Sequence, residues 1–325
     1  MISDVDIQEI DLLKDYPEAF ERLLNDHTTG ENIYWACDSY KERGKDFEFF
    51  APITISGITG KDNRLVIRPR SVKIASEQQQ RTKDKAEVFT PCWVCNVQNN
   101  LVDNAWFGHE GAFNQEIIDE SGEHSWKPVE GMIVFSSKKG KTWKDYISSI
   151  RMEITCGEAP YLVSRYDTTD GTQIPLEMRI GILDRKFRVI NEHTRDKRNW
   201  KRYAQIALKS TYGYEWQGDN LLIARENILY SIKDYFEARF NETPDKVFMK
   251  ECAEIISWNI WQMDGLTFGL PGYNVKEQII SADTLFSSDF FNEDLKPQER
   301  YCIIMDWLEN KTITFKSLIP DTKRP

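Results

Sequence analysis

The sequence predicts an α/β protein with a Rossmann-like sheet, preceded by a smaller α+β region at the N-terminus. Residues 151–162 have the pattern of a strand, a tight glycine turn and the start of a helix. Residues 213–229 have the pattern of a strand that ends in an acidic residue and is followed by an amphipathic helix. Two such units in succession are typical of a sheet whose carboxyl edge binds a nucleotide-like cofactor.

The composition is that of an ordinary globular protein. The chain has 325 residues, of which 40% are hydrophobic, enough for one large domain or two smaller ones. No stretch approaches the length of an apolar membrane span, and four of the first eleven residues are acidic, the reverse of a secretory leader. We therefore expect a soluble cytoplasmic protein with reduced thiols. Cys92 and Cys95 are best interpreted as small apolar positions on a helix.

The N-terminal region combines two kinds of hydrophobic spacing. Apolar residues recur every three or four positions within residues 5–45, and Pro17 is placed to open a second helix. Residues 53–58 and 65–67 alternate like strands around a polar, glycine-containing turn, which predicts a hairpin.

A polar run without apolar periodicity, residues 76–85, predicts a linker. We place the domain boundary there, giving an N-terminal region of residues 1–78 and a second domain of residues 79–325. Within the second domain, residues 101–150 contain scattered aromatic residues among Gly, Asn and Ser. This composition predicts an irregular insertion ahead of the cofactor strand.

Three segments in a fixed order carry a resemblance to a known family. Residues 86–91 end in Phe-Thr-Pro, and the units at 151–162 and 213–229 follow. This order resembles the amino-methylating (N6-adenine) DNA methyltransferases, especially the modification subunits of restriction systems. Their pattern is a Phe-Thr-Pro turn, an Asp-Pro-Ala-Cys-Gly-Ser-Gly loop, and Gly-Ile-Glu before a helix with Ala-Arg-x-Asn-Leu-Leu. The resemblance covers about residues 81–310.

The chain departs from the family pattern in the loop. Glu158 replaces the serine, and Ala159 and Pro160 occupy the second glycine and its neighbour. A carboxylate at Glu158 would repel the methionine carboxylate of a cofactor unless it turned outward or met the ammonium group. Pro160 is compatible with the first turn of a helix, so residues 161–166 are expected to be helical.

The resemblance implies S-adenosylmethionine as the cofactor. Glu215 would bind two ribose hydroxyls and Trp216 would stack on adenine, while Asp219 is placed to cap the following helix. Either Asp264 or Asp283 would contact adenine. The candidate cofactor-binding residues are Phe89, Thr90, Pro91, Glu153, Cys156, Gly157, Glu215, Trp216 and Asp264.

The family's catalytic tetrapeptide, Asn/Asp-Pro-Pro-Tyr/Phe, does not occur in the sequence. Its nearest counterparts are residues 263–266, after a strand-like run at 255–261, and residues 303–307. The second fits the expected order better, which makes Asp306 and Trp307 the candidate catalytic residues. We therefore expect a divergent methyltransferase-like subunit of a restriction-modification or related defence system, acting on DNA with a partner subunit that supplies target recognition.

A formal charge of −10 requires any DNA contact to use a local basic surface. Basic residues concentrate in two segments, 61–73 and 185–202. Two other functions remain open: a catalytically silent interaction protein with the same fold, and a nuclease that uses Asp167, Glu177 and Lys186 as a metal site.

Overall fold

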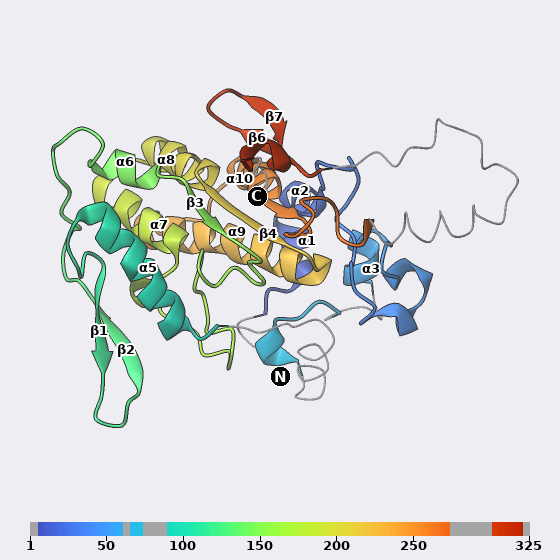
Figure 1. The fold of residues 1–325 in the computed structure, drawn as a ribbon, viewed down its shortest axis with the longest axis horizontal. Coiled ribbons are helices and arrows are strands. Elements are labelled where there is room, and N and C mark those ends of the chain that lie inside the picture. Colours follow the sequence, from blue (N-terminus) through green and yellow to red (C-terminus); the bar gives the residue numbers. More distant parts are fainter. Residues whose placement is uncertain (1–5, 61–65, 74–89, 274–300, 321–325) are drawn as a thin grey trace, which may run out of the picture.

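The computed structural model describes residues 6–60, 66–73, 90–273 and 301–320 (Figure 1). Its architecture is mixed α/β, with one parallel sheet and two antiparallel hairpins. None of the helices within these residues combines the length and apolarity needed to cross a bilayer.

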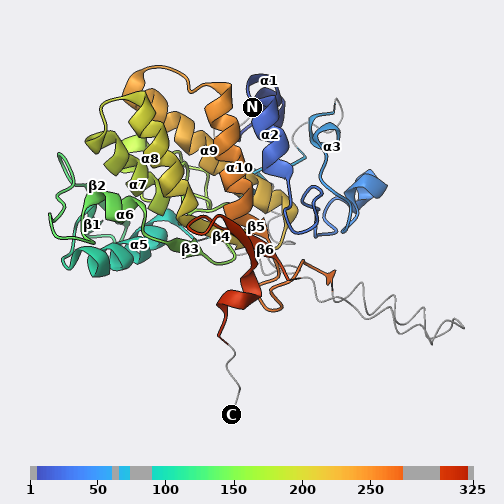
Figure 2. The same ribbon diagram turned by 90° about the horizontal axis from the view of Figure 1, so that it is seen from above.

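The parallel sheet has three short strands, β3 (Arg151–Glu153), β4 (Thr211–Glu215) and β5 (Ile260–Gln262), in the order β3-β4-β5. Helices α7 (Ile182–His193) and α8 (Lys197–Lys209) connect the first two strands. Helices α9 (Gly218–Phe240) and α10 (Lys246–Asn259) connect the second pair. The strand order advances in one direction, so crossovers of the same hand place all four helices on one face of the sheet (Figure 2). The described residues add no further strand to this sheet, which is smaller than the predicted one.

An antiparallel hairpin covers part of the opposite face. It consists of β6 (Ile303–Asp306) and β7 (Lys311–Thr314). Ile304 of β6 belongs to the same buried cluster as Tyr214 and Trp261, which project from the sheet. The sheet therefore lies between a thick helical layer and a thin hairpin layer.

In the N-terminal region, α1 (Glu9–Asp15) and α2 (Pro17–Leu24) are helical as predicted, with Pro17 at the first helical position. The hairpin predicted around residue 60 is wrong for residues 53–58. Residues Ile55–Thr59 form the short helix α3, which the Thr54 side chain caps by accepting a hydrogen bond from the Gly57 amide. Ile55 and Ile58 are three residues apart, so this short run fits a helical period as well as a strand-like one. In the second predicted strand, Val66 and Ile67 form a bend instead, and Leu65 lies outside the described residues.

The N-terminal helices share a hydrophobic core with α7 to α10. Phe20 and Leu23 of α2 belong to the same buried cluster as Leu229 and Ile256 of α9 and α10. The predicted domain boundary falls within residues 74–89, outside the described part. Buried contacts thus join the regions on both sides of it.

Residues 101–150 are more regular than predicted. They contain the second half of α5 (Cys92–Phe107), the hairpin β1 (Asn114–Ile118) and β2 (His124–Pro128), and α6 (Trp143–Ile147). The regular structure of this segment was missed in part because the buried face of α5 is largely polar and gives no apolar period. Asn96, Asn100 and Asp103 of α5 are buried against Arg185 of α7, whose guanidinium donates to all three.

Two further predictions of secondary structure are corrected. The strand expected at 255–261 is mostly helical, because α10 continues to Asn259 and leaves only β5 extended. Residues 161–166 are not helical: they begin in a turn, continue as irregular backbone, and end in the isolated bridge between Tyr166 and Gln173. The 3₁₀ helices are η1 (Lys41–Arg43), η2 (Lys45–Phe47), η3 (Arg70–Val72), η4 (Leu176–Met178) and η5 (Phe315–Leu318).

Candidate functional site

The glycine turn after β3 and the acidic end of β4 meet at the carboxyl edge of the sheet. Glu215 accepts hydrogen bonds from the backbone amides of Gly157 (2.9 Å) and Gln217 (3.2 Å). Gly213 of β4 lies beside the turn, and a Cβ atom there would contact the Cys156 sulfur at 3.4 Å, an ordinary packing distance. Two of the three predicted cofactor segments, 58 residues apart in sequence, are therefore in direct contact.

The turn itself has an unusual backbone. Thr155, Gly157 and Ala159 have positive φ values of 47°, 53° and 64°. Two of these residues carry a Cβ atom, for which this conformation is unfavourable. Such strained conformations cluster at ligand-binding and active sites, where surrounding contacts hold them in place. The strain marks residues 155–159 as a functional candidate on grounds independent of the sequence resemblance.

The Glu158 carboxylate, which was expected to repel the carboxylate of a cofactor, points into the protein. Its carboxylate accepts hydrogen bonds from the Arg70 amide (2.6 Å) and the Tyr166 hydroxyl (2.7 Å). Asn227 of α9 donates to the Glu158 carbonyl (3.2 Å) and to the Tyr166 hydroxyl (3.1 Å). The Glu158 carboxylate is thus used to fix the turn against its surroundings.

Two buried carboxylates lie beneath the turn. Burial, the largest effect, raises the pKa of Glu153 well above its ordinary value, and the nearby Glu215 carboxylate raises it further. Burial also raises the pKa of Glu215, although the Gly157 and Gln217 amides oppose this. The Tyr161 amide lies 3.4 Å from Glu153, on the segment that follows the turn. Burial therefore favours the neutral, protonated forms of both carboxyl groups.

An N-terminal segment packs over the end of β4. The Trp216 indole donates to the Ala36 carbonyl (3.0 Å), and the Gly218 amide at the start of α9 donates to the Trp35 carbonyl (3.0 Å). A Cβ atom on Gly218 would lie only 2.1 Å from the Tyr34 carbonyl oxygen, so this contact requires glycine. The indole of Trp216 is thus held by residues far from the cofactor segments.

The remaining cofactor candidates border the same edge. Thr90 and Pro91 precede α5, whose Asn99 donates to the Tyr161 carbonyl (3.0 Å), and α5 therefore runs beside the segment after the turn. Asp264 follows β5. The amide of the preceding residue, Met263, donates a hydrogen bond to the Glu215 carbonyl. The Asp264 carboxylate accepts from Leu266 and Thr267 in its own turn. Phe89 and the alternative Asp283 lie outside the described residues.

The candidate catalytic residues occupy the other end of the sheet. The Trp307 indole donates to Asn259 (2.7 Å), whose amide donates to the carbonyl of Thr211, the first residue of β4. Glu215 is the last residue of that strand, about 13 Å away along it. The Asp306 carboxylate accepts from backbone amides of its own hairpin turn. This placement argues against Asp306 and Trp307 as partners of a cofactor bound beside Glu215.

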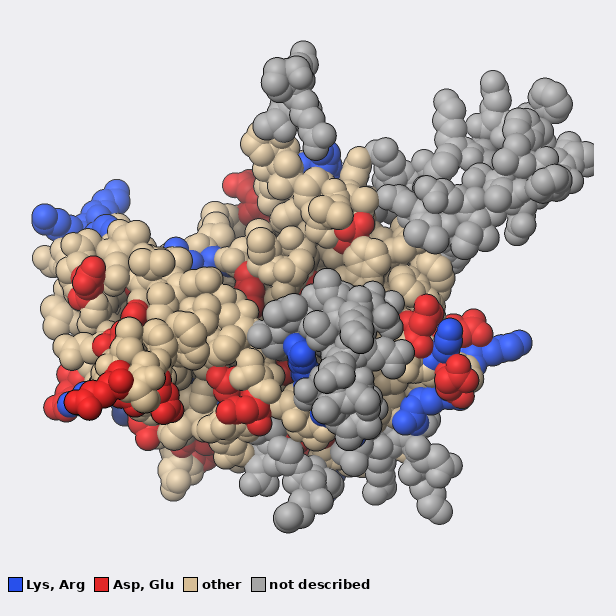
Figure 3. All heavy atoms as spheres, turned by 60° about the horizontal axis from the view of Figure 1, so that its bottom comes forward, with Lys and Arg blue, Asp and Glu red and all other residues tan. Residues whose placement is uncertain are grey.

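Part of each basic segment is buried, while Arg195, Lys197, Arg198 and Arg202 remain exposed. Arg185 and Lys186 are buried, the latter donating to Ser210 and Thr211. Lys73 is buried in an ion pair with Asp219 (3.5 Å). Asp219 is therefore not the predicted helix cap; Gln217 occupies that position without a side-chain cap bond. On the face in Figure 3, basic groups are scattered among acidic ones over a mostly uncharged surface.

The residues proposed for a nuclease are separated in the fold. Asp167 accepts from the Cys92 amide at the start of α5, Glu177 is exposed on η4, and Lys186 is buried against neutral oxygens. Over residues 6–60, 66–73, 90–273 and 301–320, no three acidic, histidine or cysteine side chains gather as a metal-ligand group. This part of the structure gives the nuclease interpretation no support.

The sequence analysis missed the polar side chains that assemble the site. Asn227 joins α9 to the turn, and Arg225 joins α9 to the ends of α2 and α10. Both residues belong to the Ala-Arg-x-Asn part of the third segment. Their match to the family pattern was the signal in the sequence that could have singled them out. Their observed roles are structural. Comparison of the chain with protein-family models, curated proteins and solved structures gave no match.

Proposed function

We propose that this chain is a divergent S-adenosylmethionine-binding, methyltransferase-like subunit that acts on DNA together with a partner subunit. The observation that carries the proposal is the contact between the strained turn at Gly157 and the Glu215 carboxylate. A glycine turn after one strand and an acid at the end of the next are the two elements by which Rossmann-like folds hold a nucleoside cofactor. The sequence resemblance gives S-adenosylmethionine as the first candidate.

In this proposal, the cofactor ribose takes the place of the Gly157 and Gln217 amides on Glu215, with Trp216 and Asp264 beside it. The proposal includes a partner because Asp306 and Trp307 lie at the far end of β4. A partner would then supply DNA recognition and the groups that act on adenine. The resemblance to modification subunits of restriction systems motivates this division of roles.

One set of contacts favours a second function, that of a catalytically silent interaction protein. Both Glu215 oxygens already accept backbone hydrogen bonds, and residues 34–36 pack against Trp216 and Gly218. In a protein that has lost its cofactor, such internal contacts would replace the ligand. The two functions differ in whether the purified chain binds S-adenosylmethionine.

Isothermal titration calorimetry with S-adenosylmethionine separates them. The comparison uses the wild-type protein, Glu215→Gln, and the control Glu309→Gln, which removes an exposed carboxylate from the β6–β7 turn. We expect binding by the wild type and the control, and at least about ten-fold weaker binding by Glu215→Gln, since each lost charged hydrogen bond contributes about 1.5–3 kcal/mol. Absence of wild-type binding would favour the interaction protein. Equal binding by Glu215→Gln would move the cofactor site elsewhere.

A further inference from the structure

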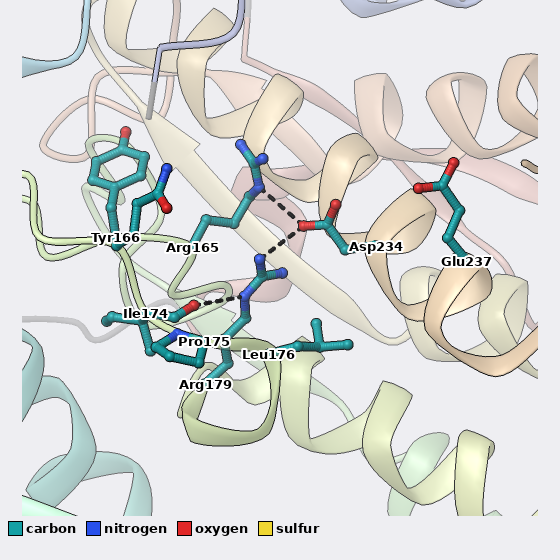
Figure 4. A pocket seen from close by; sticks show the side chains of 9 residues that line it. Arg165, Tyr166, Ile174, Pro175, Leu176, Arg179, Asp234 and Glu237 are labelled. Carbon is teal, nitrogen blue, oxygen red and sulfur yellow. Dashed lines mark hydrogen bonds and ion pairs between the residues drawn. The ribbon is translucent and has the colours of Figure 1, made fainter. Parts of the chain in front are cut away.

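Carboxylates neutralise many of the basic side chains in this protein. Arg165 and Arg179 both form ion pairs with Asp234, at distances of 3.3 and 2.8 Å (Figure 4). Three partly or fully exposed lysines are paired as well: Lys197 with Glu242, Lys201 with Asp245 and Lys250 with Glu18. A group of exposed basic side chains without carboxylate partners therefore stands out in a chain whose formal charge is −10.

Such a group lies at the loop that precedes α6, at one end of the molecule (Figure 1). Lys138, Lys139 and Lys141 of the loop and Lys144 of α6 are all exposed. None of the four forms an ion pair with a residue that the structure describes. The Lys141 ammonium donates to the Trp106 carbonyl, a neutral acceptor, so its charge is not cancelled.

Helix α8 continues this basic surface. Lys144 Nζ lies 5.9 Å from the centre of the Tyr203 ring, and the guanidinium carbon of Arg202 lies 4.6 Å from the same centre. Arg198 precedes Arg202 by one helical turn, so both project from the same side of α8. Both arginines are exposed, and neither is ion-paired within the described part of the chain. Together these residues form what we call the loop–α8 surface: Lys138, Lys139, Lys141, Lys144, Arg198 and Arg202.

The carboxylates on the neighbouring elements reduce the charge of this surface only in part. Asp145 accepts hydrogen bonds from the backbone amide and the hydroxyl of Thr142 (2.8 and 2.6 Å), and Asp196 caps α8 by accepting a backbone amide of its first turn (2.9 Å). Hydrogen bonds lower the pKa of both carboxyl groups, so both are ionised at neutral pH. Glu192 of α7 is paired with Arg188 (2.9 Å). The basic residues outnumber these carboxylates, and the surface keeps a net positive charge.

This arrangement suits an extended polyanion better than a single small anion. The six cationic groups are spread over a loop and a helix, and each of them is exposed. Dispersed, hydrated cations gain little from one phosphate group, but each can neutralise a different phosphate of a nucleic-acid backbone and release its counterions. Such contacts position a protein on a duplex without reading its sequence.

We propose that the loop–α8 surface binds the phosphate backbone of duplex DNA. The choice of DNA among polyanions rests on the proposed function, whereas the surface itself shares no residue with the cofactor site at Gly157 and Glu215. Recognition of a target sequence would still come from the partner subunit, because contacts to phosphates carry no information about the bases.

The test is fluorescence anisotropy with a labelled duplex of about 20 base pairs at salt concentrations from about 50 to about 200 mM. The proteins are the wild type, Lys138→Gln/Lys139→Gln, Arg202→Gln, and the control Lys41→Gln/Lys45→Gln. The control removes the same charge as the first variant from exposed residues of η1 and η2 in the N-terminal region. Circular dichroism of each variant checks that the fold is retained.

We expect the wild type and the control to bind DNA equally. Lys138→Gln/Lys139→Gln should bind at least about ten-fold more weakly at the lowest salt concentration, and Arg202→Gln at least about three-fold more weakly. For the double variant, the slope of log affinity against log salt concentration should become shallower by about one to two, since each lost phosphate contact accounts for about 0.9.

Three results would overturn the proposal: no wild-type binding at the lowest salt concentration, unchanged binding by Lys138→Gln/Lys139→Gln or by Arg202→Gln, or an equal loss of binding in the control. Tighter binding to vesicles that contain phosphatidylserine than to DNA would also overturn it, because the surface would then serve a membrane. The titration with S-adenosylmethionine is unaffected by any of these results, so the cofactor site and the DNA surface fail separately.

Discussion

Replacement of the buried Arg225 by Met should strongly destabilise the protein. The Arg225 guanidinium is fully buried and donates to four backbone carbonyls, those of Leu23, Asn25, Ser257 and Ile260. Leu23 and Ser257 lie in the last turns of α2 and α10, where carbonyls lack partners within their own helix. A single side chain therefore joins the N-terminal region, the helical layer and the sheet.

The expected loss follows from two opposing effects. Burial lowers the pKa of Arg225 to about 10, so the group stays charged at neutral pH and its desolvation costs stability. Methionine would remove that cost, but it would leave four carbonyls without their donor. Removing one side of a buried charged network costs about 3–5 kcal/mol, and we expect Arg225→Met to lose stability in this range. Arg225→Lys should lose less, because an ammonium group still reaches some of the carbonyls.

Urea unfolding followed by circular dichroism measures this loss. The control, Arg202→Met, changes an exposed arginine and should alter stability by no more than about 0.5 kcal/mol. A loss below about 1 kcal/mol for Arg225→Met, with an unchanged dependence on urea concentration, would refute the reasoning. It would mean that water or other donors satisfy the carbonyls.

Two further predictions concern buried polar groups. Burial, with the nearby Asp6, raises the pKa of Glu9 from 4.5 to about 8, so the folded state binds more protons than the unfolded state between these values and stability falls as pH rises. Glu9→Gln should remove this dependence of stability on pH. It should stabilise the protein by up to about 4 kcal/mol at pH 8 but hardly at all at pH 4. The free energy of unfolding in urea, measured from pH 4 to pH 8, would contradict this if it changed with pH in the same way for the wild type and the variant. Asn227→Ala should speed amide hydrogen exchange of residues 157–166 by at least about ten-fold. The substitution removes the group that donates to the Glu158 carbonyl and the Tyr166 hydroxyl. Unchanged protection, measured by hydrogen-exchange mass spectrometry, would show that other contacts hold the turn.

Local patterns in the sequence were enough to predict several elements correctly. Pro17 begins α2, and β4 ends at Glu215. The amphipathic pattern that predicted α9 also gives its core residues, which are buried: Leu221, Leu222, Ile228, Leu229, Ile232 and Phe236. Each depends on the chemistry of neighbouring residues: a fixed proline φ angle, or a period of 3.6 residues in apolar side chains.

Only the tertiary structure determined which polar residues are buried and what they contact. Arg185 and Lys186 had the sequence pattern of a basic surface, yet Arg185 fills the polar face of α5 and Lys186 is buried against the start of β4. Glu158 turns toward Arg70, 88 residues away, rather than into the proposed ligand site. Trp307 joins the end of the sheet opposite Glu215. A charged or aromatic side chain can be stable on the surface or inside, and its environment depends on whether distant segments supply hydrogen-bond partners, which local periodicity does not encode.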